Sequence, residues 1–305
     1  MAQFVLRRLL RALFALWGVS TIVFVVMRLS GDPVPLLLPP DAPTSEIFRV
    51  RSELGLDQPL PVQYLVFFGN LLHGDLGRSI HMRLPAMQVA SERLEATLQL
   101  ALCSFVLAVV IAIPAGLVSA LKRNSIWDNL AMGLALIGQS APTFYIGIML
   151  ILIVGLKFGL LPISGRGGWQ NLVMPSITLG AFAMASIARL TRSAVLDVSR
   201  ADFIRTARAK GLNEAGILTR HNLKNAAIPI ITIMGLQFGT LLGGAVVTET
   251  VFSWPGIGRL AIQSIFSRDY PVVQSAVILV ASFFVIVNFV VDLAYGWLDP
   301  RIRYS

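Results

Sequence analysis

The sequence predicts an all-α polytopic membrane protein with six transmembrane helices. Of its 305 residues, 55% are hydrophobic and only 13% are charged, and the mean hydropathy is +0.74, a balance outside the usual range of soluble proteins. About 20 helical residues cross a hydrocarbon core of about 30 Å, so long uncharged runs mark the candidate spans. Six such runs are present, at residues 12–27, 96–121, 129–156, 167–188, 225–248 and 270–291.

The first run follows the basic start MAQFVLRRLLR, which also resembles the beginning of a secretory signal. We expect an uncleaved anchor, because the residues after the apolar core, VVMRLSGDP, are bulky and offer no small-x-small cleavage site. The run is short, but Leu9 and Leu10 lengthen it if Arg11 extends its guanidinium to the interface. Residues 1–29 are therefore predicted to form an N-terminal tail and the first transmembrane helix.

Residues 30–95 are predicted to form an extracytoplasmic segment between the first two transmembrane helices. It begins with the turn-rich SGDPVPLLLPPDAP and continues with the helix-like SEIFRVRSELGL. The later stretch PVQYLVFFGNLLHGDLGRSI is apolar but contains Gly and charges, which favours an amphipathic or re-entrant element at the outer interface. His73 and His81 lack metal-ligand spacing, and the single Cys103 lies inside a span. We therefore expect no metal site, and we interpret Cys103 as a packing residue.

Residues 96–305 are predicted to form the core of the protein, and proline interrupts several of its spans. Pro114, Pro142 and Pro175 each remove a backbone donor and kink a membrane helix, which serves either packing or gating. Three glycines share one face of the fifth span and favour close helix contact, inside the chain or between subunits. They are Gly235, Gly239 and Gly243.

The distribution of Lys and Arg predicts the orientation. Cytoplasmic loops are enriched in these residues, and most of them fall on one side if the N- and C-termini are both cytoplasmic. The net charge of +9 then lies almost wholly on that side. Because this topology accounts for the isoelectric point near 10.4, we expect no nucleic-acid partner.

Few polar groups lie inside the spans. Asp292 ends the last span one turn after Asn288, and a structural bond to a neighbouring helix or Arg is favoured over proton coupling. Glu249, at the outer end of the fifth span, either meets a charged substrate or receptor or caps the following turn. The uncharged candidates for lining a pathway, or for linking helices, are Gln139, Ser140, Thr143, Gln237 and Thr240. Since no Ser/Lys, Asp/Asp or His/Glu set converges at depth, we expect no catalytic residues.

Residues 190–227 form the most basic loop, and helix signals predict a helix pair within it. Ser199 followed by Asp202 is a plausible N-terminal cap pair, and Gly211 is a natural stop, so a short helix is expected at 200–210. Asn213 is expected to cap a second helix. That helix is predicted to run through Asn225, with Pro229 opening the next span.

The first helix of this loop has a composition suited to a protein partner. Helical spacing predicts Phe203, Ala207 and Lys210 near one another, with Arg205 and Arg208 on a neighbouring stripe. A lipid-binding helix would carry several large apolar anchors on one face. Small residues with Arg instead favour docking into a cleft of another protein.

The loop sequence TARAKGL followed by RHNLKNAAIPIIT resembles the cytoplasmic coupling loop of ABC importer permeases of the dipeptide, oligopeptide, glutathione and nickel branch. The resemblance covers nearly the whole chain, including LGLDQPLPVQY, GDLGRS, RLEATLQLAL, ETVFSWPGIGRL, RDYPVVQ and DLAYGWLDPRIR. It is similar to the first, or B-type, of the two permease subunits. The resemblance implies an ABC type I importer permease-like fold in the inner or plasma membrane of a prokaryote.

The general permease motif begins Glu-Ala-Ala and places Gly four residues after the second Ala. In this chain Arg205, Thr206, Ala207 and Gly211 occupy those positions, so only the last two match. The later Ile-x-Leu-Pro is also absent, as is usual in the peptide and nickel branch. The resemblance assigns ATPase coupling to Asp202, Phe203, Arg205, Thr206, Ala207, Arg208 and Gly211.

The resemblance also implies partners: a second homologous permease, two ABC ATPase subunits of one or two kinds, an extracytoplasmic substrate-binding protein and membrane lipid. The sequence contains no G-x-x-x-x-G-K-[ST] loop, so we expect no cofactor in this chain and assign ATP and Mg²⁺ to the partner subunits. Short peptides are the expected substrates, with glutathione or nickel as alternatives. A passive channel and an intramembrane enzyme are the alternatives from other classes.

Overall fold

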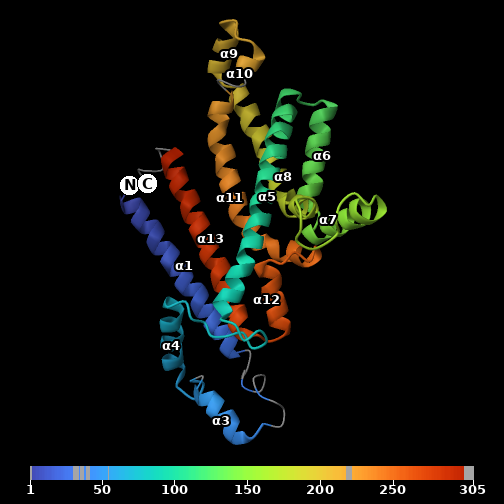
Figure 1. Cartoon of the computed structure of the whole chain (residues 1–305). Coiled ribbons are helices and arrows are strands. Elements are labelled where there is room, and N and C mark those ends of the chain that lie inside the picture. The colour runs from blue at the N-terminus through green and yellow to red at the C-terminus, as the bar shows by residue number, and fades with distance from the viewer. Residues whose placement is uncertain are drawn as a thin grey trace. The chain divides into compact units, whose positions relative to one another are not determined.

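The computed structural model describes residues 2–29, 34, 38, 42–53, 55–217 and 222–298, and nearly all of them are helical (Figure 1). Within this part of the chain, five helices are long and apolar enough to cross a membrane, and one bent helix pair brings the number to as many as six. The prediction of an all-α membrane protein is confirmed, and the predicted six spans are reached only if the bent pair counts as one span.

The chain divides into two compact units. Unit 1 comprises Met1–Val5, Leu98–Trp254 and Val287–Ser305, and unit 2 comprises Leu6–Thr97 and Pro255–Ile286. The helices, labelled as in Figure 1, are α1 (Ala2–Leu29), α3 (Thr44–Glu53), α4 (Leu60–Leu72), α5 (Ala86–Leu121), α6 (Ile126–Ser140), α7 (Thr143–Leu150), the π-helix η1 (Ile151–Lys157), α8 (Gln170–Ser199), α9 (Asp202–Ala209), α10 (Glu214–Ile217), α11 (Leu223–Val251), α12 (Ile257–Phe266) and α13 (Tyr270–Leu298).

In unit 1, α8 packs against α11, α6 and α7. Its buried Ala188 and Val195 belong to two apolar clusters that also include residues of α5 and α11. Glycines bring the backbones of α5 and α8 together, because a Cβ on Gly116 would lie 2.6 Å from the Ala188 carbonyl oxygen, and one on Gly180 would lie 2.9 Å from that of Ser104. The core of unit 1 therefore depends on small residues at helix crossings.

The apolar run 129–156 is not the single span that the sequence predicts. α6 ends at Ser140, the next residue is extended, and Pro142 precedes α7 with φ −59° and ψ 137°. The axis of the pair Ile126–Ser140 and Thr143–Lys157 bends by 112°. Proline disfavours helical geometry in the residue before it, which explains why the helix ends there.

In unit 2, the chain between the first two spans is largely helical. α5 begins at Ala86, earlier than the expected start at 96, and the apolar stretch expected at the interface forms α4, a helix of 13 residues. The buried Asp269 fastens the chain before α5, since it accepts hydrogen bonds from Ser79 Oγ (2.5 Å) and Ile80 N (3.2 Å). This contact joins segments that are far apart in the sequence.

Candidate coupling loop and pathway residues

The loop between α8 and α11 contains two short helices, α9 and α10, at the end of these long helices (Figure 1). Gly211 has φ +79° and follows α9, which confirms the predicted stop. Asn213 Oδ1 accepts a hydrogen bond from Gly216 N at 2.8 Å, which confirms the predicted cap of α10.

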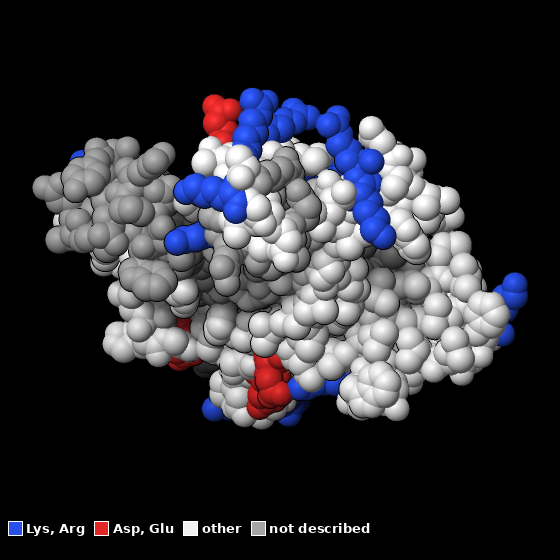
Figure 2. All heavy atoms as spheres, turned by 90° about the horizontal axis from the view of Figure 1, so that it is seen from above, with Lys and Arg blue, Asp and Glu red and all other residues white. Residues whose placement is uncertain are grey.

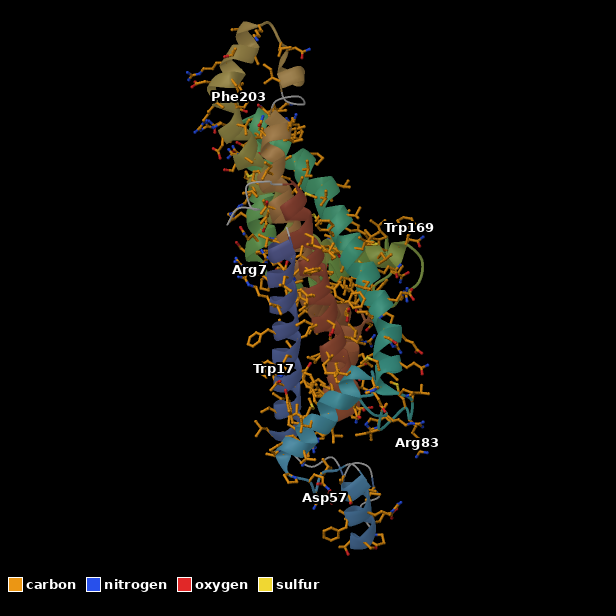
Figure 3. All side chains as sticks on the ribbon, turned by 90° about the vertical axis from the view of Figure 1, so that its left-hand side faces the viewer. Arg7, Trp17, Asp57, Arg83, Trp169 and Phe203 are labelled. Atoms are coloured by element: carbon orange, nitrogen blue, oxygen red, sulfur yellow. The ribbon has the colours of Figure 1, made fainter. Side chains whose placement is uncertain are left out.

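A small apolar core holds the two short helices together. Ile204 and Ile217 are fully buried, and Ala207 is 6% exposed in the same cluster. The sequence placed Ala207 beside Phe203 and Lys210 on a docking face, but its side chain packs inside the loop because α10 covers it. The other two side chains are exposed, and Figure 3 labels Phe203, which is 46% exposed, on α9.

The exposed side of α9 is polar and basic. Arg205 Nη1 lies 3.6 Å from Asp202 Oδ1, with both side chains mostly in solvent, so the pair contributes little stability. Thr206 and Gly211 are also exposed, whereas the Arg208 side chain lies outside the described residues. Figure 2, seen from the α9 end of the molecule, shows Lys and Arg side chains gathered along one edge of this face.

The two ends of the loop differ from the sequence prediction. Ser199 does not cap α9: it ends α8, its hydroxyl donates to the Val195 carbonyl oxygen (2.7 Å), and it accepts from Asn222 Nδ2 (2.9 Å). The described part of the second helix, α10, runs from Glu214 to Ile217, and residues 218–221, over which the predicted helix would continue toward Asn225, lie outside the described residues. α11 begins before Pro229, which lies inside it.

A buried ionic network, not singled out from the sequence, lies where α5, α6 and α8 meet. Asp128, at the start of α6, accepts hydrogen bonds from Arg192 Nε (2.7 Å) and Nη2 (2.8 Å). It also accepts from Asn124 N (2.9 Å) and from the Ser119 hydroxyl. Ser125 followed three residues later by Asp128 is a helix-start signal in the sequence, but the partner on α8 is 64 residues away.

The structure brings three of the predicted pathway residues together. Thr143, Gln237 and Thr240 line a cavity of about 150 Å³ between α7, α8 and α11. The Thr240 hydroxyl donates to the Gln237 backbone carbonyl oxygen at 2.8 Å. The three residues thus line one space between these helices, which is compatible with the pathway interpretation.

The other two uncharged candidates lie elsewhere. Gln139 accepts a hydrogen bond from Arg189 Nη1, and both residues line a larger depression of about 590 Å³ between α6, α8 and α11. Ser140 is exposed at the end of α6. Arg189 gives this depression a positive group, whereas the charge of Arg192 is paired with Asp128, and neither arginine was a pathway candidate from the sequence.

The three remaining candidates occupy different places. The side chain of Glu249 is fully buried, so it does not meet a receptor or a substrate from the surface in this conformation. Its backbone carbonyl oxygen accepts from Trp254 N at 2.8 Å, within the turn that follows α11. Asn288 packs near Gly239, where a Cβ would lie 3.2 Å from its Oδ1, and Asp292 is half-buried on α13.

The glycines predicted to share one face of α11 differ in their contacts with the rest of the chain. Gly239 approaches Asn288, but a Cβ on Gly243 would meet no atom within 4 Å.

Among the described residues, no group of three or more His, Cys, Asp or Glu side chains is placed to hold a metal ion. His73 and His81 are exposed, and each has a ring nitrogen within hydrogen-bond distance of a backbone carbonyl oxygen.

Comparison with known proteins places this geometry in context. Residues 112–304 match the family described as binding-protein-dependent transport system inner membrane component, and residues 1–112 match its N-terminal family. The chain is 44% identical to the glutathione transport system permease protein GsiC and 41% identical to the dipeptide transport system permease protein DppB, both of Escherichia coli (strain K12), with 100% of each chain covered.

Two solved structures of the inward-facing MetNI methionine ABC transporter share the fold. One has a TM-score of 0.60 at 19% identity and covers 70% of this chain and 97% of the other. The second has a TM-score of 0.56 at 21% identity and covers 70% and 95%. The likeness therefore extends to an ABC importer permease architecture.

Proposed function

The chain belongs to the family of binding-protein-dependent transport system inner membrane components, and from this premise we propose that it carries short peptides across the membrane. It is a multi-pass inner-membrane permease subunit of an ABC importer, a transport subunit and not an enzyme. Family membership rules out the passive-channel and intramembrane-enzyme alternatives. The observation that carries the proposal is the identity of 41–44% over full length to a dipeptide and a glutathione permease.

Short peptides are the substrates we favour, and glutathione is the second candidate because it is itself a tripeptide and GsiC is 44% identical. Nickel is less well supported, because the whole sequence contains three His and one Cys, the residues with nitrogen and sulfur ligands that Ni²⁺ favours. The cavity lined by Thr143, Gln237 and Thr240 offers hydroxyl and amide groups, which suit the backbone of any short peptide.

ABC importer permeases work with ATPase subunits and a binding protein, as the family description implies. We propose that α9 contacts the ATPase through its exposed residues, including Phe203, Arg205 and Thr206, while Ala207 and Gly211 maintain the shape of the loop. ATP and Mg²⁺ would bind the partner subunits. Two ATPase subunits, of one or two kinds, and a second homologous permease would complete the importer.

The loop is suited to transmit movement because of where its ends lie. α8 ends where the loop begins, and α11 begins where the loop ends. The hydrogen bond between Ser199 and Asn222 joins these two ends. The same two helices line the cavity that contains Gln237 and Thr240. A displacement of α9 by an ATPase would therefore reach the pathway through α8 and α11. The positive charge of this loop supports a cytoplasmic position, with both termini on the same side.

Substrate uptake by the assembled importer tests the proposal. The permease, its homologous partner, the ATPases and the binding protein are reconstituted in vesicles, and uptake of a labelled dipeptide is compared with that of labelled glutathione. We expect ATP-dependent uptake of the dipeptide at the higher rate. Faster uptake of glutathione would transfer the assignment to the second candidate, and nickel uptake without peptide uptake would contradict both.

A further inference from the structure

A cavity of about 230 Å³ lies in unit 2 between the end of α1 and α4. Arg28 contributes a cation to its lining, and its guanidinium carbon lies 5.3 Å from the centre of the Phe24 ring, which also lines the cavity. Asp75 contributes a carboxylate and accepts a hydrogen bond from Gly77 N at 2.9 Å. The cavity therefore presents one positive and one negative group to the same space.

Two of the lining groups lack a full set of partners. Within the described part of the chain, Arg28 forms no ion pair with a carboxylate, and its guanidinium contacts the Phe24 ring. Gln63 donates to the Gln58 carbonyl oxygen (2.7 Å), but its buried Oε1 accepts no hydrogen bond from a described residue. Arg28 is the accessible one of these two groups, so a ligand that offers an anion would supply the partner that its guanidinium lacks.

The cavity lies beside a membrane surface. The span in α1 ends at Leu29, directly after Arg28. Phe67 and Leu71 of α4 pack in one apolar cluster with Val23 of α1. Tyr64 OH lies 2.8 Å from Thr21 Oγ1, and its ring is 5.3 Å from that of Phe24. The cavity is therefore at the depth where a span leaves the hydrocarbon core, which is the level of lipid headgroups.

The outward face of α4 is apolar. Val62, Leu65, Val66 and Leu72 are 41–78% exposed and recur at helical spacing, and the first and third of them also line the cavity. An apolar stripe on a short helix next to a span end is typical of a helix that lies in the membrane interface. The acyl chains of a lipid could pack on this apolar stripe, which adjoins the polar cavity.

We propose that this cavity binds the zwitterionic headgroup of a membrane phospholipid that carries a phosphate and a primary ammonium. The Arg28 guanidinium holds the phosphate, because its planar fork matches phosphate oxygens. The ammonium donates to the Asp75 carboxylate, and the acyl chains lie along Val62 and Val66. A short peptide also carries both charges, but it would leave the adjoining apolar stripe uncovered. This lipid site does not depend on which substrate the importer carries.

The test uses the full importer complex purified in mild detergent, with retained phospholipids counted by mass spectrometry. We expect Arg28→Gln to reduce retained phosphatidylethanolamine about tenfold, because hydrogen bonds to a charged group are lost. Arg28→Lys should retain most of the lipid, since the charge remains. Arg83→Gln is the control, because Arg83 is exposed in the same unit and projects away from α1 (Figure 3). Equal retention in Arg28→Gln and in Arg83→Gln would overturn the proposal.

A second comparison tests the ammonium contact. Asp75→Asn should remove the preference for phosphatidylethanolamine over phosphatidylglycerol, whereas Asp57→Asn, at an exposed position outside the cavity lining, should leave it unchanged. An unchanged preference in Asp75→Asn would contradict the assigned orientation of the headgroup. Labelled dipeptide is then added to the complex that retains its phospholipid. Binding that requires Arg28 and displaces the phospholipid would overturn the lipid in favour of a peptide.

Discussion

Unit 1 contains two Asp–Arg pairs with opposite properties. Asp202 and Arg205 lie on α9 with 95% and 78% of their side chains exposed and a single contact of 3.6 Å. Asp128 and Arg192 are 4% and 26% exposed and make two hydrogen bonds of 2.7 and 2.8 Å. An exposed pair contributes little to folding and remains available to a partner, whereas a buried, bidentate pair fixes helices in place. The first pair suits a docking surface and the second a rigid base beneath it.

The largest expected loss of stability comes from removing one partner of the buried Asp128–Arg192 pair. Asp128→Ala leaves the half-buried Arg192 uncompensated, and we expect the free energy of unfolding to fall by about 3 kcal/mol. Unfolding in a denaturing detergent measures this, with Asp202→Ala as the control, expected to change by less than about 0.5 kcal/mol. Equal losses in the two variants would remove the distinction between the pairs.

A smaller effect, on the coupling of ATP hydrolysis to uptake, is expected at Gly211. This substitution tests the backbone conformation of the loop instead of an ion pair. Its φ of +79° costs a side-chain-bearing residue about 1–2 kcal/mol, so Gly211→Val should distort the end of α9. We expect uptake per ATP hydrolysed to fall about tenfold in reconstituted importer.

Gly159→Val is the matched control for that experiment, since Gly159 has φ +61° and open space around it but lies after η1, outside the loop. Equal coupling losses in the two variants would indicate general strain in unit 1 and would contradict a special role for the loop.

Reversing the charge of Arg205, one member of the exposed pair, should moderately weaken binding of the ATPase subunits and hardly change the stability of the permease. Arg205→Glu is expected to weaken binding of the ATPase subunits about fivefold, a change of about 1 kcal/mol. Titration of detergent-solubilised permease with ATPase subunits measures this, and Arg83→Glu in unit 2 is the control. Unchanged affinity in Arg205→Glu would show that α9 does not dock through this side chain.

The smallest of the main effects is expected at the cavity between α7, α8 and α11. Thr240→Val removes the hydroxyl that donates to the Gln237 backbone carbonyl oxygen within α11, and loss of one local hydrogen bond of this kind should cost about 0.5 kcal/mol. If Thr240 lines the pathway, the apparent KM for peptide uptake should rise while the thermal unfolding temperature hardly changes. An unchanged KM together with a lower unfolding temperature would assign Thr240 to helix packing alone.

Local signals in the sequence were reliable where one residue decides the local geometry. Gly211 ends α9 because glycine adopts positive φ without strain, and Asn213 caps α10 through its side-chain oxygen. The bend at Pro142 shows the limit of such signals. Proline predicts a kink, but its angle of 112° depends on how α6 and α7 pack against α8.

The sequence by itself determined the membrane class, the number of apolar segments and the end of α9, because hydropathy, charge and backbone preference act over a few residues. Only the tertiary structure decided that Ala207 faces Ile204 and Ile217, and that Asp128 pairs with Arg192, 64 residues along the chain. It also decided that Arg28 and Asp75 line one cavity. Those contacts arise from helix packing, which determines the faces through which distant segments meet. A local sequence pattern does not specify these faces.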